Sequence, residues 1–111
     1  MIGINANDSI KYPDDSFEEM KKRAAAIGHN FPYLWDETQA VAKLYGAVCT
    51  PDIFVYNKER KLVYRGRIDD NWQEQEKVTK HELYDALQCL IDKKTLPEKQ
   101  NPSMGCSIKW K

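Results

Sequence analysis

The segment 46–56 (GAVCTPDIFVY) constrains the fold of this chain more than any other part of the sequence. The proline at position 51 has no N–H to donate and restricts the preceding Thr50 to extended geometry. The four apolar residues 53–56 then have the composition of a buried strand. The segment therefore predicts a helix that ends at Gly46, a Thr-Pro turn and a strand. X-Pro bonds are trans by default, but a cis bond here would expose backbone beside Cys49 for pairing with an extended peptide or a thiol.

Helices and strands alternate through the rest of the chain. Three capping boxes predict where helices begin: Ser16 with Glu19, Asp36 with Gln39, and Thr79 with Glu82. Two glycines, Gly28 and Gly46, predict where the first two helices end. Short apolar runs predict strands at 2–4, 31–35, 53–56 and 62–68. The order is strand-helix-strand-helix-strand-strand-helix, which predicts an α/β fold with a mixed sheet flanked by helices.

Apolar spacing predicts which helix faces are buried and where the folded domain ends. The two apolar stripes are Phe17, Met20, Ala24 and Ile27, and Leu83, Leu87, Leu90 and Ile91. Cys89 lies one residue off the second stripe and is expected to be a small buried hydrophobe. Two prolines and a glycine after position 96 predict an irregular tail over 97–111, so the expected domain covers 1–96.

Composition excludes several classes of protein. Seventeen basic residues balance seventeen acidic ones among 111 residues, which argues against nucleic-acid binding through a basic surface. No apolar run approaches the ~20 residues needed to cross a bilayer, and the first residues lack the features of a signal peptide. Three widely spaced cysteines suggest neither a disulfide scaffold nor a zinc site, so a reducing, cytoplasmic setting is expected.

Six segments together resemble the peroxiredoxin-like redoxins of the AhpC/TSA group, within the thioredoxin-like proteins. The segments are 2–8 (IGINAND), 11–15 (KYPDD), 31–34 (FPYL), 36–39 (DETQ), 50–52 (TPD) and 105–110 (GCSIKW). The resemblance covers nearly the whole chain. It implies a thioredoxin fold, thiol–disulfide or peroxide-reducing chemistry, and a cis-proline loop at Thr50-Pro51 that faces the redox site.

The sequence departs from that family where its chemistry resides. By resemblance, the reactive cysteine lies on a strand–helix unit that precedes the segment matching 2–4, often within Cys-x-x-Cys. This chain has no Cys-x-x-Cys, and none of its three cysteines matches that nucleophile. The thioredoxin-like fold is therefore expected to be incomplete, without the central strand between 2–4 and 53–56.

Unpaired strand edges must be resolved in some way, because buried unpaired backbone groups cost about 1–3 kcal/mol each. The flanking strands could close on each other, a second copy could donate a strand, or the chain could be one piece of a longer protein. A homo-oligomer or strand exchange is the favoured expectation for these edges. Separately, a thiol or disulfide protein is expected as a partner.

Cys49 is the best candidate for a reactive thiol. It follows a helix C-terminus, whose dipole does not favour a thiolate, and no Lys or Arg adjoins it. Cys106 is the second candidate, and it could form a disulfide with Cys49 if their Cα atoms came within ~7 Å. Thr50 and Pro51 are expected to line the substrate side of the site.

The remaining polar residues offer no other chemistry. His29 and His81 have no partner at ligand or triad spacing and are expected on the surface, and no metal site or cofactor is predicted. Two functions stay open. The first is a thiol-disulfide or peroxide redox protein, weak or inactive alone because the usual cysteine is absent. The alternative is a non-catalytic thioredoxin-fold module for oligomer assembly or peptide binding.

Overall fold

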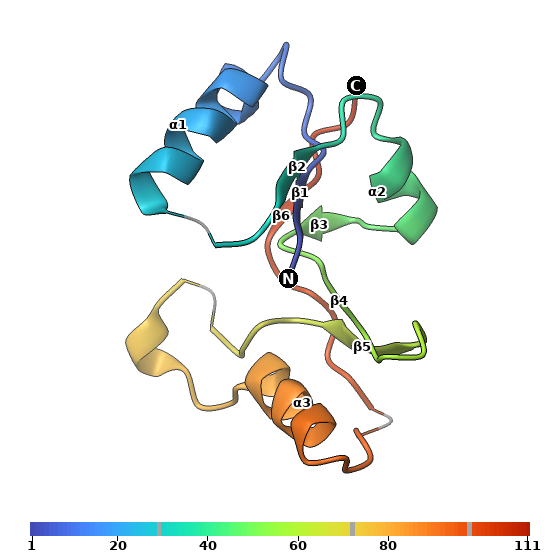
Figure 1. Cartoon of the computed structure of the whole chain (residues 1–111). Helices are drawn as coiled ribbons and strands as arrows, with labels where there is room; N and C mark the ends of the chain where they lie inside the picture. Colours follow the sequence, from blue (N-terminus) through green and yellow to red (C-terminus); the bar gives the residue numbers. More distant parts are fainter. Residues whose placement is uncertain (29, 72, 98) are drawn as a thin grey trace. The chain divides into compact units, whose positions relative to one another are not determined.

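The computed structural model describes residues 1–28, 30–71, 73–97 and 99–111. The chain forms two compact units (Figure 1): the first unit comprises Met1–Ala47 and Ile108–Lys111, and the second comprises Val48–Ser107. The helices and strands in chain order are β1 (Gly3–Asn5), η1 (Pro13–Asp15), α1 (Phe17–Ile27), β2 (Tyr33–Trp35), α2 (Ala40–Tyr45), β3 (Cys49–Thr50), β4 (Ile53–Tyr56), β5 (Leu62–Gly66), η2 (Gln75–Lys77), α3 (Glu82–Ile91) and β6 (Cys106–Ser107).

The first unit is built on the parallel pair β1–β2, in which Ile4 lies opposite Leu34. Helix α1 covers one face of this pair, where the Phe17 ring stacks on Trp35 with ring centroids 5.5 Å apart. The Ser16 side chain accepts a hydrogen bond from the backbone N–H of Glu19, as the capping box predicts. The pair and its helix thus follow from local signals in the sequence.

The last residues of the chain are fastened to the first unit by polar side chains. The carbonyl of Lys109 accepts a hydrogen bond from the backbone N–H of Asp8 at 2.7 Å. The Lys109 N–H donates to Asn7 Oδ1 at 2.8 Å, and Ile108 is buried. Residues 108–111 therefore belong to the folded part of the first unit.

Helix α2 begins later than its capping box predicts. Gln39 is the residue before the helix, with a left-handed backbone (φ 65°), and its side chain makes no cap hydrogen bond. Asp36 Oδ2 instead accepts from the N–H of Ala42 at 2.8 Å. The prediction was wrong because the Gln39 amide is used by more distant backbone groups. The helix does end at Gly46, in the left-handed conformation.

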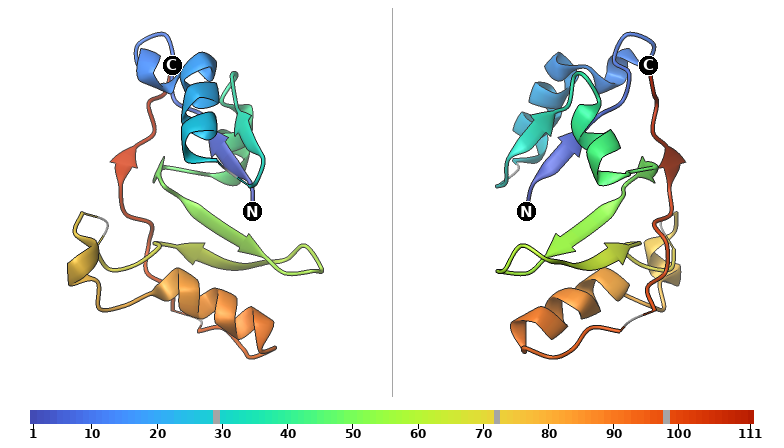
Figure 2. Two further views of the ribbon diagram at one scale, coloured as in Figure 1. Left: turned by 60° about the vertical axis from the view of Figure 1, so that its left-hand side comes forward. Right: turned by 90° about the vertical axis from the view of Figure 1, so that its right-hand side faces the viewer.

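The second unit is built on the antiparallel hairpin β4–β5, alongside which α3 lies (Figures 1 and 2). Helix α3 starts at Glu82 after His81, so the predicted capping box from Thr79 is wrong. Both the N–H and the hydroxyl of Thr79 bond to Asp70, which lowers the pKa of that carboxyl to about 2. The return strand is also shorter than predicted and ends at Gly66.

The predicted α/β class is confirmed, but the predicted order of elements is not. Parallel and antiparallel pairs both occur, and among the described residues they form three separate two-stranded sheets, β1–β2, β3–β6 and β4–β5. Strands β3 and β6 were absent from the predicted order, because two residues are too few to show a period of two. The predicted irregular tail therefore contains a strand, and the domain boundary at 96/97 stays a prediction.

The predicted apolar stripes are buried only where a second element covers them. On α1, Met20 is 2% exposed, whereas Phe17 is 40% and Ile27 is 65% exposed, contrary to their expected place in the core. On α3, Ala86 is buried while Ile91 is 74% exposed. A helical period fixes which face is apolar, and tertiary neighbours decide how much of that face leaves water. No helix among the described residues is long and apolar enough to span a membrane.

Candidate thiol site

The candidate site lies in the second unit, where β3 leads into the Thr50-Pro51 turn. The antiparallel pair β3–β6 places Thr50 opposite Cys106, and the Thr50-Pro51 peptide bond is cis. Gly105 approaches this turn so closely that a Cβ atom there would stand 2.1 Å from the Thr50 carbonyl oxygen. Thr50 and Pro51 are both exposed, so the turn presents a surface to solvent.

Asp52 anchors the turn from inside. Its side chain is only 4% exposed. Oδ2 accepts a hydrogen bond from the N–H of Val48 at 3.1 Å and lies 3.4 Å from Arg65 Nη2. Oδ1 lies 2.7 Å from Ser103 Oγ, which is also 2.8 Å from the carbonyl oxygen of Gly66. A single carboxylate therefore connects the turn to β5 and to the segment that precedes β6.

Cys49 is a half-buried thiol whose surroundings disfavour ionisation. Its Sγ donates to the carbonyl oxygen of Pro51 at 3.6 Å. Burial raises the pKa of the Cys49 thiol, the negative charge of Asp52 raises it further, and the positive charge of Arg65 lowers it in part. Since the thiolate is the nucleophile, Cys49 is poorly activated at neutral pH.

Cys106 comes close to Cys49 in the fold but does not face it. Strand β6 lies beside β3 with Cys49 opposite Ser107 and Thr50 opposite Cys106. Because successive side chains point to opposite faces of a strand, the two cysteines lie on opposite faces of this pair. Both are free thiols, as is the half-buried Cys89, so the disulfide that a folded-back tail could have allowed is not formed. The C-terminal tail does fold back onto β3, but Cys106 pairs with Thr50, one residue away from the pairing with Cys49 that a disulfide needs.

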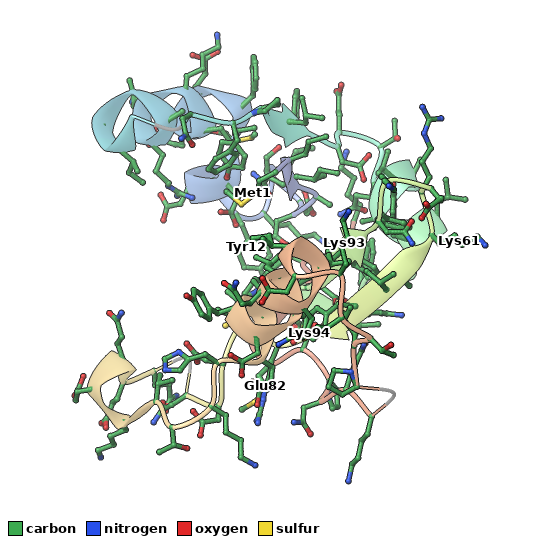
Figure 3. All side chains as sticks on the ribbon, turned by 60° about the horizontal axis from the view of Figure 1, so that its bottom comes forward. Met1, Tyr12, Lys61, Glu82, Lys93 and Lys94 are labelled. Atoms are coloured by element: carbon green, nitrogen blue, oxygen red, sulfur yellow. The ribbon has the colours of Figure 1, made fainter. Side chains whose placement is uncertain are left out.

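An ion pair connects the end of β5 to the start of α3 in the same unit. Glu82, labelled in Figure 3, lies in the first turn of α3. Its Oε1 accepts from Arg67 Nε at 3.0 Å and from Nη2 at 2.5 Å. The buried Tyr64 hydroxyl donates to the Arg67 carbonyl oxygen, and burial raises the pKa of Tyr64. These bonds hold the end of β5 to the start of α3, while Glu82 Oε2 is buried without a hydrogen-bond partner among the described residues.

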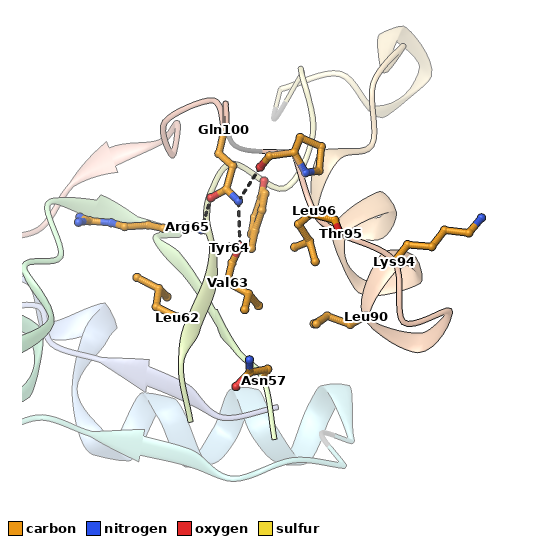
Figure 4. Close-up of a pocket in the computed structure, with 11 residues that line it drawn as sticks. Asn57, Leu62, Val63, Tyr64, Arg65, Leu90, Lys94, Thr95, Leu96 and Gln100 are labelled. Atoms are coloured by element: carbon orange, nitrogen blue, oxygen red, sulfur yellow. Dashed lines mark hydrogen bonds between the residues drawn. The ribbon is translucent and has the colours of Figure 1, made fainter. Parts of the chain in front are cut away.

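A groove of about 560 Å³ runs along the outer edge of β5 (Figure 4). Its lining is mainly apolar, with Leu62, Val63, Leu90 and Leu96 among the residues that form it. The Gln100 side chain lines the groove and bonds to this edge: Nε2 donates to the Val63 carbonyl oxygen at 2.9 Å, and Oε1 accepts from the Arg65 N–H at 2.9 Å. The Gln100 amide thus makes hydrogen bonds to β5 that a neighbouring strand would otherwise make.

Among the described residues, no three His, Cys, Asp or Glu side chains gather as metal ligands would. His81 is exposed at the start of α3, and His29 lies outside the described residues.

Sequence reasoning missed Asp52, Ser103 and Gln100. Only Asp52 carried a local signal, because it directly follows the Thr-Pro turn. The roles of Ser103 and Gln100 depend on partners that lie 37 or more residues away along the chain, at Asp52, Gly66 and Val63. No local pattern can indicate such pairings.

Two solved structures resemble the chain over nearly its whole length. An uncharacterized conserved protein from Geobacillus kaustophilus matches with a TM-score of 0.90 and 50% identity, covering 99% of this chain and 59% of that one. A hypothetical protein from Sinorhizobium meliloti 1021 matches with a TM-score of 0.91 and 42% identity, covering 99% of this chain and 61% of that one. The chain therefore spans about three-fifths of the length of these structures. No curated protein matches the chain.

The family assignment rests on more than half of the chain, including β1, α1, α2 and the Thr-Pro turn. Residues 1–65 match the AhpC/TSA family. This match includes the cis Thr50-Pro51 turn and the half-buried Cys49. It agrees with the resemblance seen in the sequence, and the chain belongs to the AhpC/TSA family.

Proposed function

We propose that this chain is a redoxin-class protein of thiol–disulfide or peroxide chemistry that is weak or inactive on its own. The observation that carries the proposal is the environment of Cys49, where burial and Asp52 raise the pKa of the thiol. Cys106 lies on the opposite face of the β3–β6 pair and cannot resolve an oxidised Cys49 without rearrangement. The free thiols suit a reducing compartment such as the cytoplasm.

Within this function, the exposed Thr50 and Pro51 would contact the substrate. The cis bond and the Asp52 anchor fix the backbone of the turn, and β6 holds its other side. An activated thiol would then have to come from elsewhere, on a protein partner or on another segment. The turn supplies binding and the partner supplies the nucleophile.

The pH dependence of thiol alkylation tests this proposal. In a Cys89→Ser, Cys106→Ser background, Cys49 is the single thiol and its reaction with iodoacetamide reports its ionisation. We expect the rate to rise only above about pH 8.5, the region where an unactivated thiol ionises. The triple variant that also carries Cys49→Ser provides the blank. An apparent pKa clearly below that value would contradict the proposal and make peroxide and disulfide substrates worth assaying.

A second function, a non-catalytic module for oligomer assembly or peptide binding, is supported by β1. The Gly3 N–H donates to the Pro32 carbonyl oxygen, and the Asn5 carbonyl oxygen accepts from the Asp36 N–H. The backbone groups of Gly3 and Asn5 therefore face β2. The backbone groups of Ile4 therefore point to the other edge, where no strand pairs among the described residues. A second copy or an exchanged strand would satisfy that edge and cover Ile4, which is 45% exposed.

Sedimentation velocity over a wide range of protein concentration tests the second function. We expect the weight-average sedimentation coefficient to rise with concentration while the alkylation chemistry of Cys49 stays unchanged. A coefficient that stays at the monomer value up to the highest concentration would rule out self-assembly as the role of this edge.

A further inference from the structure

We propose that Asp52 both positions the Thr50-Pro51 turn and suppresses the nucleophilicity of Cys49, an inference that rests on the proposed redox class. Asp52 directly follows the turn, and its side chain is almost completely withdrawn from solvent. Burial of a carboxylate is unfavourable unless it is paired and hydrogen-bonded, so its partners must hold it in a defined geometry.

The partners of Asp52 come from three separate parts of the second unit. The N–H of Val48 lies just before β3, the guanidinium of Arg65 is on β5, and the hydroxyl of Ser103 is in the segment before β6. The carboxylate thus fixes both ends of the Cys49–Pro51 segment, from Val48 on one side and through its own backbone on the other. This arrangement assigns Asp52 as the positioning residue of the turn.

The same carboxylate acts on the thiol through its charge. The Asp52 carboxylate accepts from the N–H of Val48, the residue before Cys49, and the Cys49 thiol donates to the carbonyl oxygen of Pro51, the residue before Asp52. Among the described residues, the charges of Asp52 and Arg65 act on Cys49 in opposite directions. Arg65 is 42% exposed at its side chain, so solvent screens it more than the buried Asp52. The negative charge therefore dominates, and it disfavours a thiolate at Cys49.

The consequence concerns which partner the turn can serve. A substrate that reaches Thr50 and Pro51 meets a protonated Cys49, so Cys49 does not attack a bound disulfide or peroxide. The turn can then hold the substrate for a thiolate supplied from elsewhere without a competing reaction at Cys49. Asp52 would make the turn a binding element rather than a source of nucleophile.

The test compares Asp52→Asn with Ser103→Ala in the Cys89→Ser, Cys106→Ser background. Asn keeps the shape of Asp and removes the charge, whereas Ser103→Ala removes one hydrogen bond and keeps the charge. For Asp52→Asn we expect iodoacetamide alkylation at pH 8 to be about three- to tenfold faster than in the parent, with the pH profile moved to lower pH. For Ser103→Ala we expect the parent profile, even where urea unfolding shows lower stability.

Two results would overturn the inference. One is an Asp52→Asn profile equal to the parent profile. The other is an equal acceleration in both variants, which would mean that loosening of the turn rather than charge exposes the thiol. If Asp52→Asn does not fold, Arg65→Gln gives the converse test: the profile must move to higher pH, and no movement contradicts the role of charge. A low pKa of the Cys49 thiol in the parent would contradict the proposed function, whereas the differences between the variants test the role of Asp52.

Discussion

The outer edges of β5 and β1 are treated in opposite ways. At β5, the Gln100 amide bonds to the Val63 carbonyl and the Arg65 N–H, and the Asn101 carbonyl accepts from the Arg67 N–H. At β1, the backbone groups of Ile4 point to an edge that no strand among the described residues occupies. An edge whose backbone groups are already bonded cannot template another strand, whereas an open edge can. Assembly through a strand is therefore expected at β1 and not at β5.

A second glutamine, Gln39, bonds to main-chain groups near the end of β1. Gln39 is 2% exposed, and its Nε2 donates to the carbonyl oxygens of Ala6 at 2.8 Å and Lys109 at 3.0 Å. Its Oε1 accepts from the Lys111 N–H at 3.1 Å. Ala6 directly follows β1, so this buried amide bonds to the backbone just beyond the strand. In both units a glutamine side chain bonds to main-chain groups, but only at β5 do these groups belong to the strand itself.

The largest effect is expected from Gln39→Ala, which removes the buried amide. The Ala6 and Lys109 carbonyls and the Lys111 N–H lose their partner, and the free energy of unfolding should fall by about 2–4 kcal/mol. Urea unfolding followed by circular dichroism measures this. Glu37→Ala, at a neighbouring exposed position, is the control and should change stability by less than about 0.5 kcal/mol. A loss below about 1 kcal/mol for Gln39→Ala would show that water replaces the amide.

Gly66→Ala should break the closed edge of β5 by steric pressure. A Cβ atom at Gly66 would stand 2.3 Å from the Asn101 carbonyl oxygen, so the segment around residue 101 must move. We expect a loss of about 1–3 kcal/mol and faster hydrogen exchange of the Arg67 amide. Gly28→Ala, where nothing lies within 4 Å but φ is +72°, should cost about 1–2 kcal/mol without that change in exchange. Unchanged Arg67 protection in Gly66→Ala would mean that the closure does not depend on this approach.

Gln100→Ala removes the side chain that bonds to the edge of β5 and introduces less strain than Gly66→Ala. Water can replace the amide at this half-buried position, so a loss of about 1 kcal/mol is expected. Hydrogen exchange of the Arg65 amide should accelerate, and self-association should increase because the β5 edge becomes available. Gln100→Glu keeps the acceptor for the Arg65 N–H and should protect that amide better than Ala does. Sedimentation identical to the parent would remove the difference between the two edges.

Ile4→Lys should have the smallest effect on stability and should distinguish the open edge of β1 from the closed edge of β5. The side chain is 45% exposed, so the change in stability should stay within about 0.5 kcal/mol. A charge at the open edge should suppress concentration-dependent association. Leu62→Lys is the matched variant, because Leu62 is 48% exposed on β5, the closed strand. Equal suppression by both variants would argue that general surface charge, and not the β1 edge, controls association.

Local features could be read from the sequence where a few neighbouring residues decide the conformation. The Ser16 cap, the left-handed Gly28 and Gly46, and the strand after Pro51 all follow from such features. Two capping boxes were wrong for a common reason. Gln39 and Thr79 carry side chains that can bond to nearby backbone, but in the fold each bonds to a partner from another segment.

By itself, the sequence determined the family, the α/β class, most helix and strand positions, and the absence of the usual Cys-x-x-Cys pair. Tertiary structure alone decided that Cys106 lies beside Cys49 on the opposite face, that the Asp52 side chain is buried, and that two glutamine side chains bond to distant main-chain groups. The bonds from Gln39 to Ala6, from Gln100 to Val63 and from Ser103 to Asp52 join residues 33, 37 and 51 positions apart. Local propensity acts over a few residues, whereas these pairings depend on the path of the whole chain and on a register in which a shift of one residue reverses every side chain.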